Sequence, residues 1–180
     1  MNEVPGNLAT ANLLAEARQI ESSIIEIRRR LHRCPELQYE LHQTSEIVCT
    51  ELDRLDVEFS PEIAETGVVA TIGQDDSRCI MLRADMDALP IQEMADVDFR
   101  SQHEGRMHAC GHDCHTAMLL GAARILKQRE SELKGMVKLC FQPAEEGGAG
   151  AKRMCDEGVL ENPRVEKAFG IHVWPMLPSG

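Results

Sequence analysis

The chain is poor in aromatic side chains and in positive charge. Aromatic residues make up 3% of its 180 residues, and 30 acidic residues outnumber 19 lysines and arginines. Proteins that bind nucleic acid neutralise phosphates with basic side chains, and those that bind single strands also stack bases on aromatic rings. We therefore expect no nucleic-acid partner, and the net charge of −11 also argues against an anionic membrane surface.

Long apolar runs and a cysteine framework are also missing. No apolar segment approaches the ~20 residues of a membrane-spanning helix, and residues 1–5 show neither the basic nor the apolar part of a secretion signal. The seven cysteines are odd in number and irregularly spaced, unlike those of a small secreted domain held by disulfides. We expect a cytoplasmic protein without a membrane partner.

The 43% of hydrophobic residues is enough for one globular domain with a core. Apolar residues at every third or fourth position predict a helix over residues 13–31, which Cys34-Pro35 ends, and a second helix from Thr44 to Leu55. Strands and helices then alternate, at residues 67–72, 79–82, 113–126, 136–141, 149–157 and 167–173. The first two strands flank a turn and predict a hairpin. Together these elements predict an α/β fold in which helices flank a mixed β-sheet.

Residues 108–115, called the Cys/His loop below, hold three imidazoles, two thiols and a carboxylate within eight positions. Each of these groups costs free energy to bury unless it finds a partner. Neutral imidazole, thiolate and carboxylate are all ligands of zinc and related divalent ions. A single Cys-x-His triplet is weak evidence, however, because Cys110 and His112 could equally be a buried structural cysteine and a capping histidine.

The other histidines and cysteines near this loop have less specific explanations. His115 lies three residues after His112 on a similar helical face, where it could support a ligand without binding a metal. Cys114 fits packing better than ligation. No metal-binding motif surrounds the remaining histidines, which we interpret as ordinary surface or core residues: His32, His42 and His103.

Three predicted strands run into acidic or imidazole groups at or near their carboxyl ends: Asp87, the pair Glu145-Glu146, and His172. Binding sites of open α/β sheets form just beyond the carboxyl ends of the strands. We therefore expect these groups to meet the Cys/His loop.

The Glu145-Glu146 pair is the most specific of these signals. A solvated acidic loop is the usual explanation of adjacent glutamates, because glutamate is mostly exposed. This pair instead follows a strand and precedes Gly147-Gly148, in a chain that also has the Cys/His loop. We interpret one carboxylate as a metal ligand and the other as the general base that takes a proton from a metal-activated water molecule.

Five motifs occur in order along the chain: RLHRCPEL at 30–37, RADMDALP at 83–90, HACGHD at 108–113, FQPAEEG at 141–147 and GIH at 170–172. With these motifs the chain resembles the M20 metallopeptidase family in its amidohydrolase branch. That branch includes hippurate hydrolases, N-acyl-amino-acid amidohydrolases and plant auxin-conjugate hydrolases. Five ordered motifs make a chance agreement improbable.

The resemblance implies a site for two divalent metal ions, zinc or manganese, with nickel or cobalt also suitable. The implied ligands are Cys110, which would bridge the ions, His112, Glu146 and His172. Glu145 would be the general base, and Asp87 would orient a ligand imidazole. The wider family often has a histidine two positions before this aspartate. Asp85 stands there instead, and we do not assign it as a ligand.

The resemblance also implies a function. The expected reaction is hydrolysis of the amide bond of a small N-acyl amino acid, hippurate-like or acetylated, by metal-activated water. Members of this branch are much longer than 180 residues. The resemblance thus implies that residues 1–180 are the N-terminal part of a zinc-exopeptidase-like catalytic domain. That part stops before the lid and dimerisation domain and before the C-terminal half, which holds one more histidine ligand.

Two other functions fit parts of the sequence. The chain could be a metal-binding remnant or half of a split enzyme, acting through association with a missing C-terminal half or as a homo-oligomer. It could also be a metal-independent hydrolase with Cys110 as nucleophile and His112 as base. This last alternative leaves the Glu145-Glu146 pair and His172 unexplained.

Overall fold

The computed structural model describes residues 8–174, 176 and 177, with side chains from residue 12 onward. The expectations about residues 1–5 therefore lie outside the described part. In chain order the elements are α1 (Leu8–Arg33), α2 (His42–Arg54), β1 (Glu58–Ile63), β2 (Gly67–Ile72), β3 (Cys79–Asp85), α3 (His112–Gln128), a short 3-10 helix (Glu130–Glu132), β4 (Met136–Gln142), α4 (Gly150–Asp156) and β5 (Val165–Gly170).

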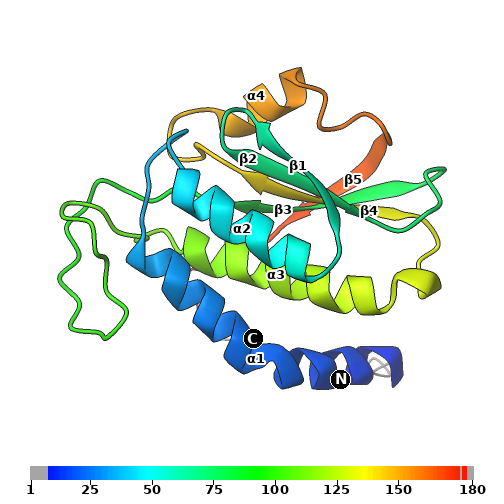
Figure 1. Ribbon diagram of the computed structural model, residues 1–180, viewed down its shortest axis with the longest axis horizontal. Coiled ribbons are helices and arrows are strands. Elements are labelled where there is room, and N and C mark those ends of the chain that lie inside the picture. Colours follow the sequence, from blue (N-terminus) through cyan, green and yellow to red (C-terminus); the bar gives the residue numbers. More distant parts are fainter. Residues whose placement is uncertain (1–7, 175, 178–180) are drawn as a thin grey trace.

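Five strands form one sheet in the order β1-β2-β4-β3-β5. Strand β3 runs parallel to both β4 and β5, whereas β2 is antiparallel to β1 and β4. Helices α1, α2 and α3 lie on one side of the sheet and α4 on the other (Figure 1). The predicted α/β fold with a mixed, helix-flanked sheet is confirmed. Because three neighbouring strands are parallel, their carboxyl ends lie along the same edge.

The predicted hairpin is wrong. Strands β2 and β3 do not pair with each other, because β4 lies between them and pairs with both. Six of the seven residues of β4 are buried, from Val137 to Gln142. A strand with a continuous buried run needs cover on both faces and both edges, and so takes the centre of a sheet. The turn pattern at residues 73–78 is local, and so it does not indicate that β4, which is distant in sequence, lies between β2 and β3.

Strand β1 was not predicted, and the predicted start of α2 is wrong by two residues. Strand β1 is largely exposed and contains Pro61, so it lacks the apolar alternation that identifies strands. Helix α2 begins at His42, two residues before the predicted cap at Thr44. The buried carboxylate of Glu36 accepts hydrogen bonds from the backbone N–H groups of Gln43 (3.1 Å) and Thr44 (2.8 Å). Glu36 therefore caps the N-terminus of this helix.

The main core lies between the sheet and the helices α1 to α3. Its fully buried apolar side chains include Leu31, Leu41, Val48, Leu52, Val68, Leu139 and Phe141. Burying one such side chain contributes about 1.5–3 kcal/mol. A smaller cluster under α4 contains Met81, Cys140, Met154 and Val159. These two clusters hold β3 and β4 rigidly, and therefore fix the strand ends that position the candidate site.

A buried lysine ties the segment before β5 to the centre of the sheet. The Nζ of Lys138, on β4, donates to the carbonyls of Val159 (2.8 Å), Glu161 (2.8 Å) and Pro163 (3.2 Å). Burial lowers the pKa of this amine. The three carbonyls satisfy its three donor positions, so we interpret Lys138 as structural.

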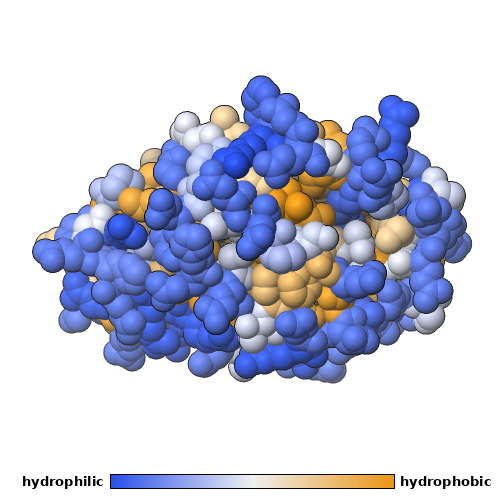
Figure 2. All heavy atoms as spheres, turned by 45° about the horizontal axis from the view of Figure 1, so that its top comes forward, coloured by the Kyte–Doolittle hydropathy of each residue, from blue (hydrophilic) through white to orange (hydrophobic). Residues whose placement is uncertain are grey.

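Strand β5 forms one edge of the sheet and ends at Gly170, so His172 lies in the loop after the strand and not within it as predicted. Large apolar side chains here are exposed: Phe169 by 51%, Ile171 by 76% and Trp174 by 60%. The face of the molecule shown in Figure 2 is mostly hydrophilic, with scattered apolar patches. Among the described helices, none combines the length and the apolar character needed to cross a membrane.

Candidate metal centre

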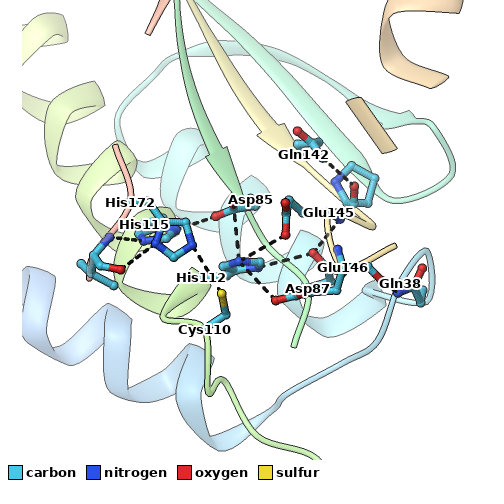
Figure 3. Close-up of polar contacts among 12 residues, drawn as sticks. Gln38, Asp85, Asp87, Cys110, His112, His115, Gln142, Glu145, Glu146 and His172 are labelled. Carbon is cyan, nitrogen blue, oxygen red and sulfur yellow. Dashed lines mark hydrogen bonds and ion pairs between the residues drawn. The ribbon is translucent and has the colours of Figure 1, made fainter. Parts of the chain in front are cut away.

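The candidate site lies at the carboxyl ends of the three parallel strands (Figure 3). Asp85 is the last residue of β3, Glu145 follows β4 by three residues, and His172 follows β5 by two. His112 opens α3 and points into the same space. The strand ends and the helix start thus bring together the acidic, imidazole and thiol groups singled out in the sequence.

His112 is at the centre of this arrangement and is fully buried. Its Nε2 lies 3.6 Å from Asp85 Oδ2, 3.8 Å from Glu146 Oε1 and 3.9 Å from Glu145 Oε2. Its Nδ1 lies 3.4 Å from Asp87 Oδ1. Both ring nitrogens and Glu146 Oε1 are buried without a hydrogen-bond partner among the described residues. Buried polar atoms of a native protein rarely stay unpaired, so His112 Nε2 and Glu146 Oε1 point to a ligand, whereas Nδ1 faces the carboxylate of Asp87.

Cys110 and His172 form the second part of the site. Cys110 Sγ lies 3.4 Å from His172 Nε2. The other ring nitrogen, Nδ1, donates to the carbonyl of Val173 (2.6 Å). A backbone carbonyl can only accept, so the proton of a neutral His172 ring is on Nδ1 and the lone pair of Nε2 faces the thiol.

Asp87 holds the backbone of the glutamate pair. Its two fully buried carboxylate oxygens accept the N–H groups of Glu145 (2.9 Å) and Glu146 (3.1 Å). Gln38 donates to the carbonyl of Glu146 from the other side. These hydrogen bonds involve only the backbone of the two glutamates. The side chain of Glu145 is 40% exposed and that of Glu146 is 23% exposed. One aspartate therefore fixes the glutamate loop and also faces the His112 ring.

The pKa values reflect a dense cluster of negative charge. Burial, followed by the neighbouring carboxylates of Glu146 and Glu145, raises the pKa of the Cys110 thiol to about 12. Burial alone would lower the pKa of His112, but the nearby carboxylates of Asp87 and Asp85 outweigh burial and raise it. Such a cluster gains from a bound cation, which stabilises thiolate and carboxylate together.

The donor set fits a divalent metal. Three groups have ligand atoms within 4.8 Å of one another: Cys110, His112 and His172; His112, Glu145 and Glu146; and Asp85, His112 and His115. Ligands bound at roughly 2.0–2.3 Å from zinc have similar mutual separations. His112 belongs to every group. Of the four predicted ligands, three thus form one group, and Glu146 joins His112 in the second.

The structure pairs Asp85 with His115, a contact that the sequence did not predict. His115 Nδ1 lies 2.6 Å from Asp85 Oδ1, and both side chains are buried. Asp85 is the last residue of β3 and stands two residues before Asp87, and both carboxylates face the His112 ring, so this spacing was the available signal. Burial would raise the pKa of Asp85, but the hydrogen bond from His115 and the nearby His112 and Arg83 lower it.

A second buried cluster lies behind the site. His32, interpreted from the sequence as an ordinary residue, contacts Asp113 (2.7 Å) and Glu93 (3.0 Å) through its two ring nitrogens. Arg28 Nε lies 2.7 Å from the same oxygen of Asp113. Burial alone would lower the pKa of His32, but its bonds to the two carboxylates raise it. Because Asp113 follows His112, this cluster joins α1 to the start of α3.

Replacing His32 by alanine should destabilise the metal-free protein by about 3–5 kcal/mol near pH 6, since the buried carboxylate of Glu93 loses its cationic partner and Asp113 keeps only Arg28. Because the pKa of His32 is raised in the folded protein, the charged imidazole contributes fully to the free energy of unfolding below its ordinary pKa of about 6.5. This contribution is lost as the pH rises through the higher pKa of the folded state. The cost of His32→Ala should therefore shrink towards alkaline pH. Urea unfolding at several pH values measures it.

His42→Ala is the matched control, because His42 is exposed on α2. Its free energy of unfolding should follow that of the parent at every pH. The parent and His32→Ala both contain His112, whose pKa is raised as well. The difference between their free energies of unfolding therefore does not include the contribution of His112. A cost of His32→Ala that does not change with pH would show that the imidazole is neutral in the folded protein.

Comparison with known proteins places the chain in a family. Residues 81–180 match peptidase family M20/M25/M40. The chain belongs to this family, which confirms the resemblance seen in the motifs. It is 49% identical over all of its 180 residues to an IAA-amino acid hydrolase of Arabidopsis thaliana. It is 44% identical over 162 residues, 89% of the chain, to the N-acetyl-L-cysteine deacetylase of Bacillus subtilis.

The fold agrees with a solved member of the family. A crystal structure of a dinuclear metal-binding M20 peptidase from Bacillus subtilis superposes with a TM-score of 0.84 and 44% identity over 89% of the chain. The chain spans 45% of that structure, and 40% and 38% of the plant hydrolase and the deacetylase. The individual roles of Glu145, Asp87 and the four ligands stay predictions.

Proposed function

We propose that the chain is part of a metal-dependent amidohydrolase that cleaves the amide bond of N-acyl amino acids. The observation that carries this proposal is the set of overlapping ligand groups that share His112, beside the partly exposed carboxylate of Glu145. Two relatives are named for reactions on an amino acid carrying an acyl group, one a hydrolase of IAA-amino acids and the other an N-acetyl-L-cysteine deacetylase.

Cys110, His112, Glu146 and His172 would hold the metal, with two divalent ions as the proposed number and zinc or manganese as the proposed element. Nickel and cobalt suit the same donors. When bound, these ions would lower the pKa of a water molecule and polarise the scissile carbonyl. Thiolate and imidazole favour zinc, whereas the carboxylates admit manganese.

Glu145 is the proposed general base. Its side chain is the more exposed of the pair, so substrate and water can reach it. The carboxylate takes a proton from the attacking water as the new carbon–oxygen bond forms. It then gives this proton to the nitrogen of the amino acid as the carbon–nitrogen bond breaks. Asp87 keeps the loop of this residue in place through the two N–H groups that it accepts.

We further propose that residues 1–180 are the N-terminal part of a catalytic domain. The edge strand β5 supports this, because among the described strands it pairs with β3 alone, beside the exposed side chains of Phe169 and Ile171. A further segment of polypeptide, or a second copy of the chain, would cover this edge. The same observation favours the second candidate function, a half-enzyme that acts through association.

The test compares two proteins. One is residues 1–180 alone. The other is a chimera, in which residues 1–180 replace the matching segment of the Arabidopsis IAA-amino acid hydrolase. Both are loaded with zinc or manganese and assayed for release of amino acid from hippurate and N-acetyl amino acids.

We expect chelator-sensitive turnover by the chimera and little or none by residues 1–180 alone. Turnover that a chelator does not affect would favour the metal-independent cysteine hydrolase. A chimera that folds and binds metal but hydrolyses no N-acyl amino acid would refute the proposed substrate class.

A further inference from the structure

We propose that His115 is a positioning residue. Held by Asp85, it fixes the backbone next to His172 and thereby aims the imidazole of His172 at the metal centre. The inference rests on the proposed metal-dependent function and concerns how one proposed ligand, which follows an edge strand, is kept in place.

The first link is the bond between Asp85 and His115. Its length is 2.6 Å, and both side chains are at least 97% buried. Asp85 is itself held on two further sides. Arg83 Nη1 lies 2.7 Å from its Oδ2, and the hydroxyl of Thr116 donates to its backbone carbonyl (3.0 Å). The carboxylate is therefore a rigid anchor at the end of β3.

The second link is from His115 to the backbone of the loop after β5. The N–H of Val173 donates to His115 Nε2 (3.0 Å). A backbone N–H can only donate, so Nε2 carries the lone pair and the ring proton is on Nδ1, which donates it to Asp85. Each ring nitrogen has one partner of the correct kind, and the orientation of the ring is determined.

The third link joins Val173 to His172. The carbonyl of Val173 accepts from His172 Nδ1, while its N–H is held by His115, so this residue is bound on both sides. The close approach of Gly111 adds a steric contact, because a Cβ built at Gly111 would lie 2.4 Å from Val173 Cγ2. The two rings themselves lie 4.6 Å apart, centroid to centroid.

His172 needs such an anchor because its own surroundings offer little. It is exposed, and it comes after the end of an edge strand. Without the hydrogen bond that Val173 donates to His115, the loop would retain the covalent link to β5, the contact of Val173 with Gly111 and the contact of His172 Nε2 with Cys110 Sγ. Supporting groups that orient a ligand imidazole typically change metal affinity by about 10- to 100-fold.

Asp85, His112 and His115 also form a group compact enough to hold an ion. The geometry favours positioning over ligation. Both nitrogens of His115 are already engaged, and the 2.6 Å separation from Asp85 is that of a hydrogen bond, shorter than two ligands of one metal usually allow. The number of bound ions separates these two roles.

The experiment uses residues 1–180 and two measurements. The first needs no metal: hydrogen exchange of the Val173 amide, followed by NMR. We expect protection in the parent, loss of protection in His115→Ala, and restoration in His115→Gln, whose amide can both donate to Asp85 and accept from Val173. An unprotected Val173 amide in the parent would overturn the proposal.

The second measurement is titration with Co²⁺, with the thiolate-to-cobalt absorption reporting Cys110. His115→Ala should lower the affinity by about 10- to 100-fold without changing the number of ions bound. If His115 acts through His172, the same change should have no further effect in a His172→Ala background. Equal losses in both backgrounds, or one fewer ion bound, would overturn the positioning role.

His42→Ala is the matched control in both measurements and should behave as the parent. Failure of the metal dependence on which the proposed function rests gives a different result. In that case the parent would not bind Co²⁺ at all, although the Val173 amide would still depend on His115. If His115→Ala does not fold, His115→Gln carries the test: it should keep the protection, the stoichiometry and most of the affinity.

Discussion

Replacing Glu145 by glutamine is expected to lower turnover by the chimera about 10²–10⁴-fold, the range that a positioned general base contributes. An amide of almost the same shape cannot accept the proton of the attacking water. Metal content should stay near that of the parent, because Cys110, His112, Glu146 and His172 are unchanged. Steady-state kinetics combined with elemental analysis of the purified protein checks both parts.

Two variants make this result specific. Glu40→Gln changes an exposed glutamate outside the site and should leave turnover and metal content as they are. Glu146→Gln removes a proposed ligand and should lower metal content and turnover together. If Glu145→Gln loses metal in proportion to activity, Glu145 is a ligand and the base must be sought elsewhere.

The second large effect is expected for His112→Ala. His112 belongs to every candidate ligand group among the described residues, so its loss affects all of them at once. We expect the affinity of residues 1–180 for Zn²⁺ or Co²⁺ to fall by more than about 100-fold, beyond the typical effect of a supporting residue. Competition titration against a chelator of known affinity measures the loss.

His42→Ala is again the control, as a histidine of the same chain that is exposed and distant in sequence from the Cys/His loop. Thermal unfolding of the metal-free proteins shows whether the variant still folds. A folded His112→Ala protein that binds metal as tightly as the parent would refute the proposed metal site.

The sequence predicted the composition of the site better than the partners of its members. The ends of strands can be predicted from the sequence because acidic groups follow apolar runs. The structure brings Asp87, Glu145 and His172 to the Cys/His loop. Neither the dual role of Asp87 nor the bond between Asp85 and His115 was predicted. Those contacts depend on where β3 lies relative to α3 and on the backbone path after β4, neither of which local sequence patterns describe.

The same division applies to the fold. Helices α1 and α3 and strand β4 were predictable because each buries one continuous stripe or run of its own residues. The neighbours of β2 were not. Its pairing with β4 instead of β3 follows from competition among all strands for the buried centre, where the apolar run of β4 gains most.

By itself, the sequence determined the family, the class of fold and the kinds of chemical group available. Only the tertiary structure decided that a fully buried His112 lies within 4 Å of four carboxylates, and that Val173, the neighbour of His172, donates a hydrogen bond to His115. The physical reason is that apolar periodicity and motif spacing are properties of neighbouring residues. Burial, strand order and the direction of a hydrogen bond arise from segments far apart in the chain that must satisfy one another at the same time.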